Sequence, residues 1–239
     1  MPTVSPCVTC PHRNLGFCGA LLEKCFEDSS RSRQDANWQH YRTVPAGRQI
    51  ATRNQVSEDV FLLCGGWGFR FYQLPDGRRQ ILNFLLPGDL FSATSVFEQQ
   101  FHFSVKALTE IQISGMRRAE VQARLAINPD ILTTLAKFCI AETEAADRML
   151  TALGQYSAEE RIAYLLLHLM QRIAARSVIR EQRYPFPLRQ QHIAAAVGLT
   201  SVHVSRVVSL FRERGIVELS DGVLQVFNLP ELERIGSLN

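Results

Sequence analysis

The chain has 239 residues, with 26 Lys and Arg against 23 Asp and Glu and a formal net charge of +3 at pH 7. The length predicts one large or two modest domains, and the small net charge excludes a polybasic coat for nucleic acid. No apolar run approaches the roughly 20 residues of a membrane span, and the N-terminus lacks the apolar core of a signal peptide. We therefore expect a cytoplasmic protein without a membrane partner, in which six cysteines favour metal or redox chemistry over a disulfide framework.

Composition divides the chain into four segments. Residues 1–40 are rich in cysteine, 41–125 contain short apolar runs, 126–156 predict a long helix, and 157–239 predict helices followed by a hairpin. The sequence has no P-loop, no G-x-G-x-x-G and no Ser/His/Asp arrangement. We therefore predict that the protein is not an enzyme.

Four cysteines lie within nineteen residues near the N-terminus, with the spacing C-x2-C-x7-C-x6-C. A C-x2-C pair lets two thiolates bind one metal ion or one face of a cluster, and the other two complete a set of four ligands. The irregular second spacing favours an iron–sulfur cluster over zinc, and a loop with unliganded thiols is the remaining alternative. We expect prolines and glycines to keep this segment an irregular wrapping loop. The candidate ligands are Cys7, Cys10, Cys18 and Cys25, and the loop formers are Pro6, Pro11, Gly16 and Gly19.

The next segment consists of short apolar runs separated by Gly, Pro and Asp turns. Five runs have the length and composition of β-strands, and their regular spacing indicates a sandwich or barrel. The runs are Val60–Cys64, Trp67–Leu74, Ile81–Leu86, His102–Leu108 and Ile111–Ser114.

A long helix is predicted to begin at Asn128-Pro129, with Asn128 as N-cap and Pro129 in the first turn. Apolar and small residues recur along it at alternating steps of four and three, which is the pattern of a heptad seam. The seam consists of Leu132, Ala136, Cys139, Thr143, Ala146, Leu150 and Leu153. A second stripe, which includes Ile131, Leu135 and Phe138, predicts that the helix packs against two partners; complete burial within one chain is the alternative.

The segment from Leu188 to Val226 has the spacing of a helix-turn-helix followed by a hairpin. Ala194 is the small residue of a close helix crossing, and Gly198 is the glycine of the turn. The second helix is predicted from about Thr200 to Arg214, and Asp221-Gly222 between apolar runs predicts a hairpin wing. We expect DNA binding, because the exposed side of the second helix carries hydroxyl, imidazole and guanidinium groups that suit a major groove. The predicted DNA contacts are Ser201, Val202, His203, Ser205, Arg206, Arg189 and Arg212; the alternative is an ordinary helical hairpin with a basic face.

Several motifs, in this order, resemble the Crp/Fnr family of transcription regulators. Gly65-Gly66 followed by LPDGRRQI and FLLPGDLF is similar to the sensor domain of that family, and SAEERIAYLLLHL and GLTSVHVSR are similar to its DNA-binding part. The resemblance implies an α+β fold with a cyclic-nucleotide-binding-type β-roll (jelly-roll) sensor domain, a long dimerisation helix and a C-terminal winged helix-turn-helix domain. It also implies a homodimer that binds an inverted-repeat operator in double-stranded DNA, with RNA polymerase as a further partner.

The N-terminal pattern C-x2-C-P-x-R-x4-C resembles the Fnr branch of the family, in which cysteines hold an oxygen-labile [4Fe–4S] cluster. That branch usually takes its fourth ligand from a late β-strand, at a position that aligns near Ser114 here, and serine supplies no thiolate. Cys25 or Cys64 is then the fourth ligand, and we favour Cys25 because it keeps the site contiguous. Fnr-branch helices also usually carry Glu at the place of Val202, where it reads cytosine, so we expect the operator to differ there from the usual Fnr site.

The resemblance also sets an expectation about cyclic nucleotides. Members that bind cyclic AMP carry a Glu shortly after the Pro-Gly-Asp turn and an Arg-Ser pair further on. Here Leu90-Phe91-Ser92-Ala93 follows that turn, and Phe103 precedes Ser104 in place of an arginine. A phosphate would have no cationic partner in an apolar pocket, so no cyclic nucleotide is expected.

We therefore expect a DNA-binding transcription regulator that senses oxygen, nitric oxide or redox state through the N-terminal cluster. One alternative is a regulator of the same fold that has no cluster and senses thiol redox state or haem, with His40 or His102 as the axial ligand. An alternative from another class is a zinc-stapled protein-interaction module that does not bind DNA.

Overall fold

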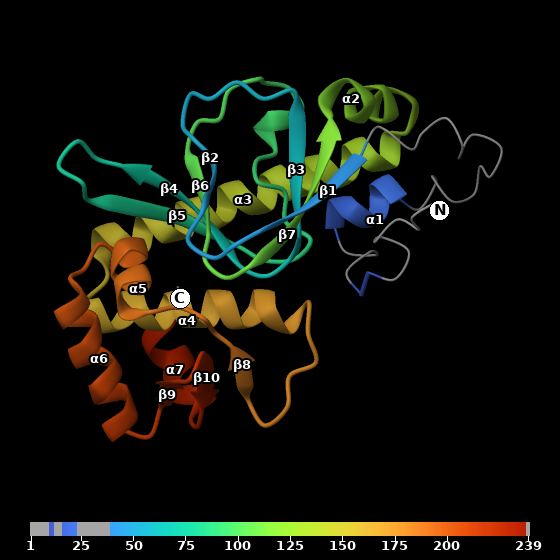
Figure 1. Cartoon of the computed structure of the whole chain (residues 1–239). Coiled ribbons are helices and arrows are strands. Elements are labelled where there is room, and N and C mark those ends of the chain that lie inside the picture. Colours follow the sequence, from blue (N-terminus) through green and yellow to red (C-terminus); the bar gives the residue numbers. More distant parts are fainter. Residues whose placement is uncertain (1–9, 12–15, 23–38, 238–239) are drawn as a thin grey trace. The chain divides into compact units, whose positions relative to one another are not determined.

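The structure is a computed structural model that describes residues 10–11, 16–22 and 39–237 (Figure 1). The chain forms two compact units. The N-terminal unit contains Met1–Phe71 and Phe84–Glu142, and the C-terminal unit contains Tyr72–Asn83 and Thr143–Asn239. Within the described part of the chain, no single helix has the length and apolar character needed to cross a membrane.

The strands of the described residues before Arg118 form the two sheets of a β-roll. One sheet has the order β1-β7-β3, and the other has the order β2-β6-β4-β5. β7 pairs antiparallel with β1 and β3, and β6 pairs antiparallel with β2 and β4. The strands are β1 (Gln39–Val44), β2 (Gln49–Ala51), β3 (Asp59–Gly65), β4 (Gly68–Gln73), β5 (Arg79–Leu85), β6 (Ser104–Ala107) and β7 (Ile111–Arg117), and a short 3-10 helix, η3 (Thr94–Val96), lies between β5 and β6.

The five predicted strands are all present as β3 to β7, with ends that differ by a few residues from the apolar runs. The apolar runs predicted them because burial against the roll interior requires such residues; Leu63, for example, is fully buried in β3. β1 and β2 were not predicted. β1 is mostly polar and half-exposed, and it is placed by its backbone ladder with β7 from Gln39↔Met116 to Val44↔Ile111.

The helix α1 (Gly16–Leu22) shows that the prediction of an irregular wrapping loop was wrong for this part of the N-terminal segment. Gly16 and Gly19 lie inside this helix. Phe17, Cys18 and Leu21 are buried in an apolar cluster that also contains residues of β3 and of the helices α2 (Arg118–Ile127) and α3 (Pro129–Gln155). Burial of these side chains therefore outweighs the low helix propensity of the two glycines, because most helical stability in proteins comes from tertiary packing.

Two helices follow the roll, α2 (Arg118–Ile127) and α3 (Pro129–Gln155). α3 begins where the sequence predicts, and the Asn128 Oδ1 atom accepts a hydrogen bond from the Asp130 backbone N–H at 3.1 Å. Ile131 and Leu135 of the second predicted stripe are buried in the same apolar cluster as α1, and Phe138 packs against it. One face of α3 is thus occupied by its own chain, as the two-stripe pattern predicts.

The C-terminal unit contains the end of α3, four further helices and a small sheet with the order β8-β10-β9. In Figure 1, α6 lies at the edge of this unit and follows α5 directly. The elements are α4 (Ala158–Ala174), β8 (Arg183–Pro185), α5 (Gln190–Val197), α6 (Ser201–Glu213), β9 (Val217–Ser220), β10 (Val223–Val226) and α7 (Leu229–Gly236).

β8 and α7 were not predicted from the sequence. β8 lies in a polar, proline-bounded connection, and Tyr184 is buried there where it pairs with Leu224 of β10. α7 approaches α4 closely, because a Cβ atom added at Gly236 would lie 2.6 Å from the Ala163 carbonyl carbon. Both elements cover the core of the C-terminal unit, so they depend on long-range packing that local composition does not reveal.

The tip of the β4–β5 hairpin belongs to the C-terminal unit. The Gln80 Nε2 atom donates a hydrogen bond to the Ala196 carbonyl oxygen at 2.9 Å, and the Arg172 Nη1 atom donates one to Asn83 Oδ1 at 2.8 Å. Ala196 is in the last turn of α5, where carbonyl groups lack partners within the helix. The hairpin therefore supplies a donor to the helix that supports the turn before α6.

Candidate nucleic-acid interface and cysteine sites

α5 and α6 form a helix-turn-helix whose two axes are bent by 107° at the turn. Gly198 ends α5 in the left-handed region with φ of 66°, a conformation that glycine adopts without steric cost. The Thr200 side chain caps α6 by accepting a hydrogen bond from the His203 backbone N–H at 3.2 Å. The predicted turn glycine and the predicted start of the second helix are confirmed.

The rotation of α6 about its axis is fixed by three buried residues, Val204, Val207 and Phe211. They form the inner side of the helix, whereas the opposite side faces solvent. The predicted DNA-contacting residues on this helix are exposed, apart from Ser205, which is half-buried; they are Ser201, Val202, His203, Ser205, Arg206 and Arg212. Arg189 is exposed at the N-terminus of α5, where its backbone N–H donates to His192 Nδ1 at 3.0 Å.

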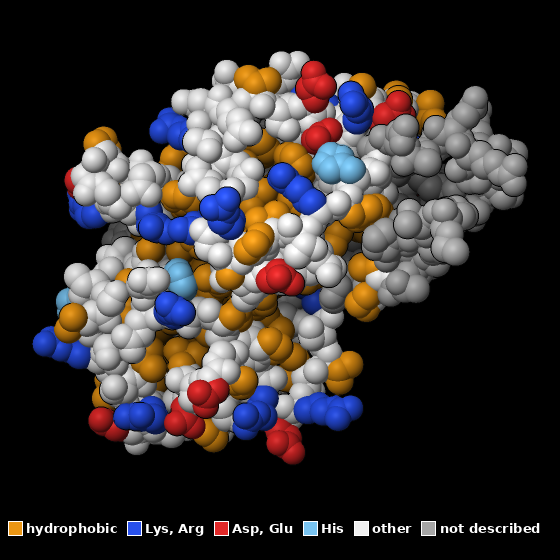
Figure 2. All heavy atoms as spheres, viewed as in Figure 1, with side chains coloured by type: hydrophobic (Ala, Val, Ile, Leu, Met, Phe, Trp, Pro, Cys, Tyr) orange, Lys and Arg blue, Asp and Glu red, His pale blue; other side chains and the backbone are white. Residues whose placement is uncertain are grey.

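The arginines of this region fall into two groups. Arg189, Arg206 and Arg212 have no ion-pair partner within the described residues, so their guanidinium groups are available to an external anion. Arg214 is different, because it pairs with Glu231 at 2.6 Å and with Glu159 at 3.5 Å. On the face drawn in Figure 2, blue Lys and Arg side chains are interspersed with red Asp and Glu side chains among the described residues, which fits local basic groups better than a continuous basic surface.

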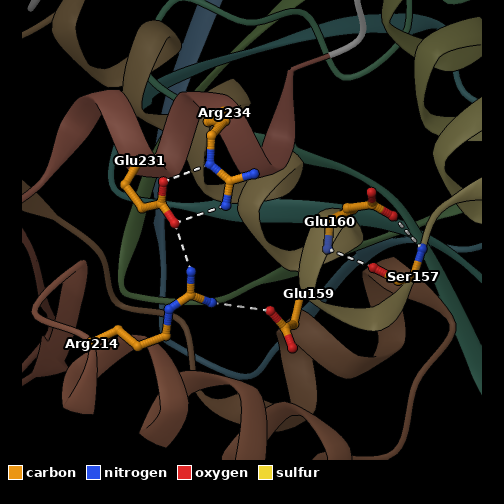
Figure 3. Close-up of polar contacts among 6 residues, drawn as sticks. All are labelled: Ser157, Glu159, Glu160, Arg214, Glu231 and Arg234. Atoms are coloured by element: carbon orange, nitrogen blue, oxygen red, sulfur yellow. Dashed lines mark hydrogen bonds and ion pairs between the residues drawn. The ribbon is translucent and has the colours of Figure 1, made fainter.

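Figure 3 shows the Arg214 guanidinium between two carboxylates that come from the starts of α4 and α7. Arg234 binds the same Glu231 carboxylate through two hydrogen bonds of 2.7 and 2.9 Å. Hydrogen bonding from Arg234, together with the charges of Arg234 and Arg214, lowers the pKa of Glu231. Arg214 follows the last residue of α6, so this group of charges connects the end of α6 to α4 and α7.

α4 begins with a capping box formed by Ser157 and Glu160. The Ser157 backbone N–H donates to Glu160 Oε2 at 2.7 Å, and the Glu160 backbone N–H donates to Ser157 Oγ at 3.3 Å (Figure 3). The hydrogen bond from the Ser157 backbone is the main cause that lowers the pKa of Glu160.

The predicted hairpin wing is present as β9 and β10. Asp221 and Gly222 connect the strands with φ values of 50° and 74°. Positive φ at both positions is the geometry of a type I′ turn, which matches the twist of a two-stranded ribbon. The helix-turn-helix is therefore followed by a wing, and the C-terminal unit has the parts of a winged helix.

The described cysteines do not form a metal site among themselves. Cys7 and Cys25 lie outside the described residues, and within the described ranges no three His, Cys, Asp or Glu side chains are grouped to hold a metal ion. Cys10 is half-buried, and Cys18 is 6% exposed on α1.

Three cysteines belong to one part of the N-terminal unit. Cys18 is a member of the apolar cluster beneath α1, and Cys64 of β3 and Cys139 of α3 pack against the same cluster. Burial, with a smaller contribution from the charge of Glu142, raises the pKa of the Cys139 thiol. Ser114 is fully buried, and its hydroxyl oxygen accepts a hydrogen bond from Gln39 Nε2 at 2.7 Å.

The predicted seam lies on the exposed side of α3. Leu132 and Leu150 are 49% and 70% exposed, Ala136, Thr143 and Ala146 are exposed, and Cys139 and Leu153 are half-buried. Ile140, which the heptad pattern left out, is 58% exposed beside the seam. Leu153 lies near the turn of the helix-turn-helix, because its Cδ2 atom would lie 3.6 Å from a Cβ atom added at Gly198.

The interior of the β-roll contains a cation, Arg70, so the expectation of an apolar pocket without a cationic partner was wrong. Arg70 and Ser104 contact other groups of the roll and α3, although Arg70 Nε has no hydrogen-bond partner among the described residues. The Arg70 guanidinium pairs with Glu142 at 2.6 Å and lies over the Phe103 ring, 4.8 Å from its centroid. Ser104 Oγ accepts a hydrogen bond from the Arg53 backbone N–H at 3.1 Å. The two histidines considered as haem ligands also face acids; His40 Nε2 lies 3.7 Å from Asp59 Oδ2, and His102 is paired with Glu98.

Two family models match the chain. A cyclic nucleotide-binding domain matches residues 41–128, and a Crp-like helix-turn-helix domain matches residues 160–235. These matches cover the β-roll and the winged helix that the structure shows.

Curated relatives and a solved structure cover most of the chain. The nitrogen fixation regulation protein FixK of Azorhizobium caulinodans is 31% identical over 72% of this chain and 68% of its own length. The transcriptional activatory protein AadR of Rhodopseudomonas palustris is 30% identical over 90% of this chain and 86% of its own length. FixK2 from Bradyrhizobium japonicum has the same fold, with a TM-score of 0.75 at 22% identity over 84% of this chain and 98% of that one. These relatives and this fold are those of transcription regulators and not of enzymes. The chain therefore belongs to the Crp/Fnr family of DNA-binding transcription regulators.

Proposed function

We propose that the protein acts as a homodimer that binds an inverted-repeat operator through two copies of α6, and that its N-terminal cysteines hold a [4Fe–4S] cluster. The observation that carries the DNA-binding part is the exposed side of α6, where Arg206 and Arg212 have no ion-pair partner within the described residues. An unpaired guanidinium can donate two hydrogen bonds to guanine or bind a phosphate without first losing an internal partner.

The exposed seam of α3 supports the homodimer. Leu132, Ile140 and Leu150 expose large apolar side chains along one helix, next to the stripe that packs on the roll. A second α3 helix would remove this surface from water, and a heptad seam is complementary to a copy of itself. A parallel pair of this kind places two recognition helices about 34 Å apart, which is one helical turn of DNA.

The cysteine spacing supports the cluster, with Cys7, Cys10 and Cys18 as ligands and Cys25 or Cys64 as the fourth. When bound, such a cluster supplies an oxygen-labile group held by four thiolates. Cys18 lies on α1, and the neighbouring side chains of Phe17 and Leu21 pack in the same cluster as Ile131 and Leu135 of α3. Loss of a cluster bond at Cys18 would therefore alter the packing of α1 against α3, the helix that carries the dimer seam. We infer that loss of the cluster to oxygen or nitric oxide weakens the dimer and its DNA binding.

We also propose that the β-roll binds no cyclic nucleotide. Arg70 is paired with Glu142, and the Ser104 hydroxyl already accepts a backbone hydrogen bond, so a phosphate would compete with existing contacts.

We further propose that RNA polymerase is a partner of the protein. The relative AadR is named a transcriptional activatory protein, and this name supports a polymerase partner.

Iron and sulfide analysis of anaerobically purified protein tests the cluster and its fourth ligand. We expect bound iron and labile sulfide in the wild type, a large loss in the Cys18→Ser variant, and a loss in Cys25→Ser or Cys64→Ser, whichever removes the fourth thiolate. Cys139→Ser is the matched control, because this residue packs against the same apolar cluster as Cys18 but is not in the proposed ligand set. Equal iron in all five proteins, or none in the wild type, contradicts the cluster.

A gel-shift measurement on a pool of randomised inverted repeats tests DNA binding independently of the cluster. We expect selection of a palindromic site and a complex that contains two copies of the chain. Binding of one copy to a site without symmetry would contradict the homodimer.

A further inference from the structure

The first turn of α6 exposes a single large apolar side chain. Val202 is 62% exposed, and it lies between Ser201 and His203, which are also exposed. Val204, two residues later, is fully buried and supplies the contact of this turn with the core. Val202 thus has no packing role in its own unit that would account for a branched apolar residue at this place.

Single exposed apolar residues are common on proteins, so exposure alone would mean little. The place of Val202 on the helix is what matters. Arg206 follows Val202 by four residues, and residues four apart lie side by side on one face of a helix. The same face therefore carries one apolar side chain and one guanidinium that has no ion-pair partner within the described residues. The N-terminal residues of the second helix of this motif are those that meet base edges in the major groove.

The major groove contains one apolar group, the C5-methyl of thymine. We propose that Val202 is a specificity-determining residue whose methyl groups pack against a thymine C5-methyl, within one or two base pairs of the guanine that Arg206 contacts. This inference rests on the proposed function, because it assumes that α6 enters the groove. It also predicts a preference against cytosine, because the cytosine N4 amine would lose water and find no acceptor on valine.

Replacement of thymine by deoxyuridine isolates this contact, because deoxyuridine keeps the base pair and the O4 acceptor and lacks only the methyl group. The operator is first selected from a randomised inverted-repeat pool, and each thymine is then replaced symmetrically in both half-sites. We expect one position at which affinity, measured by fluorescence anisotropy, falls roughly three- to fivefold per half-site, as removal of one buried methyl predicts. Replacement by cytosine at that position should weaken binding further.

Two variants assign the effect to Val202. Val202→Ala should bind more weakly to the selected site and should lose the difference between thymine and deoxyuridine. Val202→Glu should change the preference towards cytosine at the same position, because a carboxylate accepts a hydrogen bond from the N4 amine. Val178→Ala is the matched control, because Val178 is 87% exposed in the same unit and lies outside α6. Both exposed positions tolerate alanine without loss of a core contact, and circular dichroism checks that each variant is folded.

The outcomes separate this inference from the proposed function. A methyl effect at one position that disappears in Val202→Ala supports it. The assignment to Val202 is wrong if the wild type binds its selected palindrome but no deoxyuridine substitution lowers the affinity. It is also wrong if Val202→Ala keeps the same methyl effect. In both cases the proposed DNA binding through α6 is unaffected. If no inverted repeat is selected at all, the proposed function fails and this inference fails with it.

Discussion

Arg206 and Arg212 lie on the same helix, and both are exposed without an ion-pair partner within the described residues. We nevertheless expect their replacement by alanine to affect DNA binding in different ways. Arg206 lies in the second turn of α6, on the same face as Val202 in the first turn, and the N-terminal part of such a helix reaches the bases. Arg206→Ala should cost roughly 1–3 kcal/mol of binding free energy and relax the preference at one base pair. Binding to single-base operator variants measures this, and an equal loss on every sequence would reassign Arg206 to a phosphate.

Arg212 lies six residues further along α6 and serves as the comparison. Arg212→Ala should weaken binding to all sequences by a similar factor, because a phosphate contact carries no sequence information. The slope of log affinity against log salt should become shallower by about 2 in a dimer, one for each subunit. A change in base preference without a change in slope would contradict this assignment.

Gly198 has a conformational role that a substitution can isolate. Its φ of 66° favours glycine, whereas an added Cβ would have open contacts of 3.6 Å to Leu153 and 4.0 Å to Arg161. Gly198→Ala should therefore destabilise the C-terminal unit by about 1–2 kcal/mol through backbone strain alone. Urea denaturation measures the loss, and Gly154→Ala, in open space within α3, is the control that should not be destabilised.

The sequence predicts single residues well where the signal is local. Gly198, Thr200 and Asp221-Gly222 occupy their expected places because turn and cap chemistry depends on neighbouring residues. Arg214 was predicted as the end of the second helix. Its partners Glu159 and Glu231 are 55 and 17 residues away, so no local pattern could reveal these ion pairs.

Among the elements, α3 offers the most direct test of dimerisation. Leu150 is 70% exposed in the single chain, so Leu150→Glu should leave the fold of each unit intact. It should separate the dimer, because a carboxylate on a self-complementary seam would face its own copy. Operator affinity should fall on the order of 100-fold when the two half-sites are no longer bound together.

Analytical ultracentrifugation provides the measurement for α3, and Val178→Glu controls for an added charge at an exposed valine outside the helix. A dimeric Leu150→Glu protein with unchanged affinity would show that the seam is not the interface.

The charged group around Arg214 predicts a dependence on acid pH. The pKa of Glu231 is lowered from its ordinary value of 4.5 in the folded state, so its carboxylate stabilises the fold at neutral pH. This contribution should disappear as the pH falls through 4.5 towards the lower folded pKa, because the unfolded chain takes up the proton first. Thermal unfolding from pH 7 to pH 3 should show a smaller decrease in Glu231→Gln than in the wild type. Parallel curves for the two proteins would exclude this contribution.

The elements also show where sequence patterns fail. The apolar runs predicted β3 to β7, since these strands bury runs of apolar residues in the roll, and Asn128-Pro129 predicted the start of α3. α1 was missed because its two glycines indicate a loop, and its burial depends on residues from β3 and α3. β1 and β8 are polar strands that exist through pairing with β7 and β10, a property of the partner strand.

At the scale of the whole molecule, the chain forms two units, and the residues of α3 divide between them after Glu142. The order of motifs in the sequence predicted the roll, the long helix and the winged helix, and the family matches confirm that fold. The cluster stays a prediction, because Cys7 and Cys25 lie outside the described residues. A net charge of +3 implies that DNA affinity comes from a few placed arginines, and under the proposed function the state of the homodimer should control that affinity.

The most direct test of the account follows DNA affinity and cluster absorbance together during controlled aeration of anaerobically purified protein. We predict a coloured, iron-containing protein whose operator affinity falls on the order of tenfold or more as the absorbance is lost, within the usual range of allosteric coupling. A colourless, iron-free protein that binds the operator equally tightly before and after aeration would contradict the proposed switch.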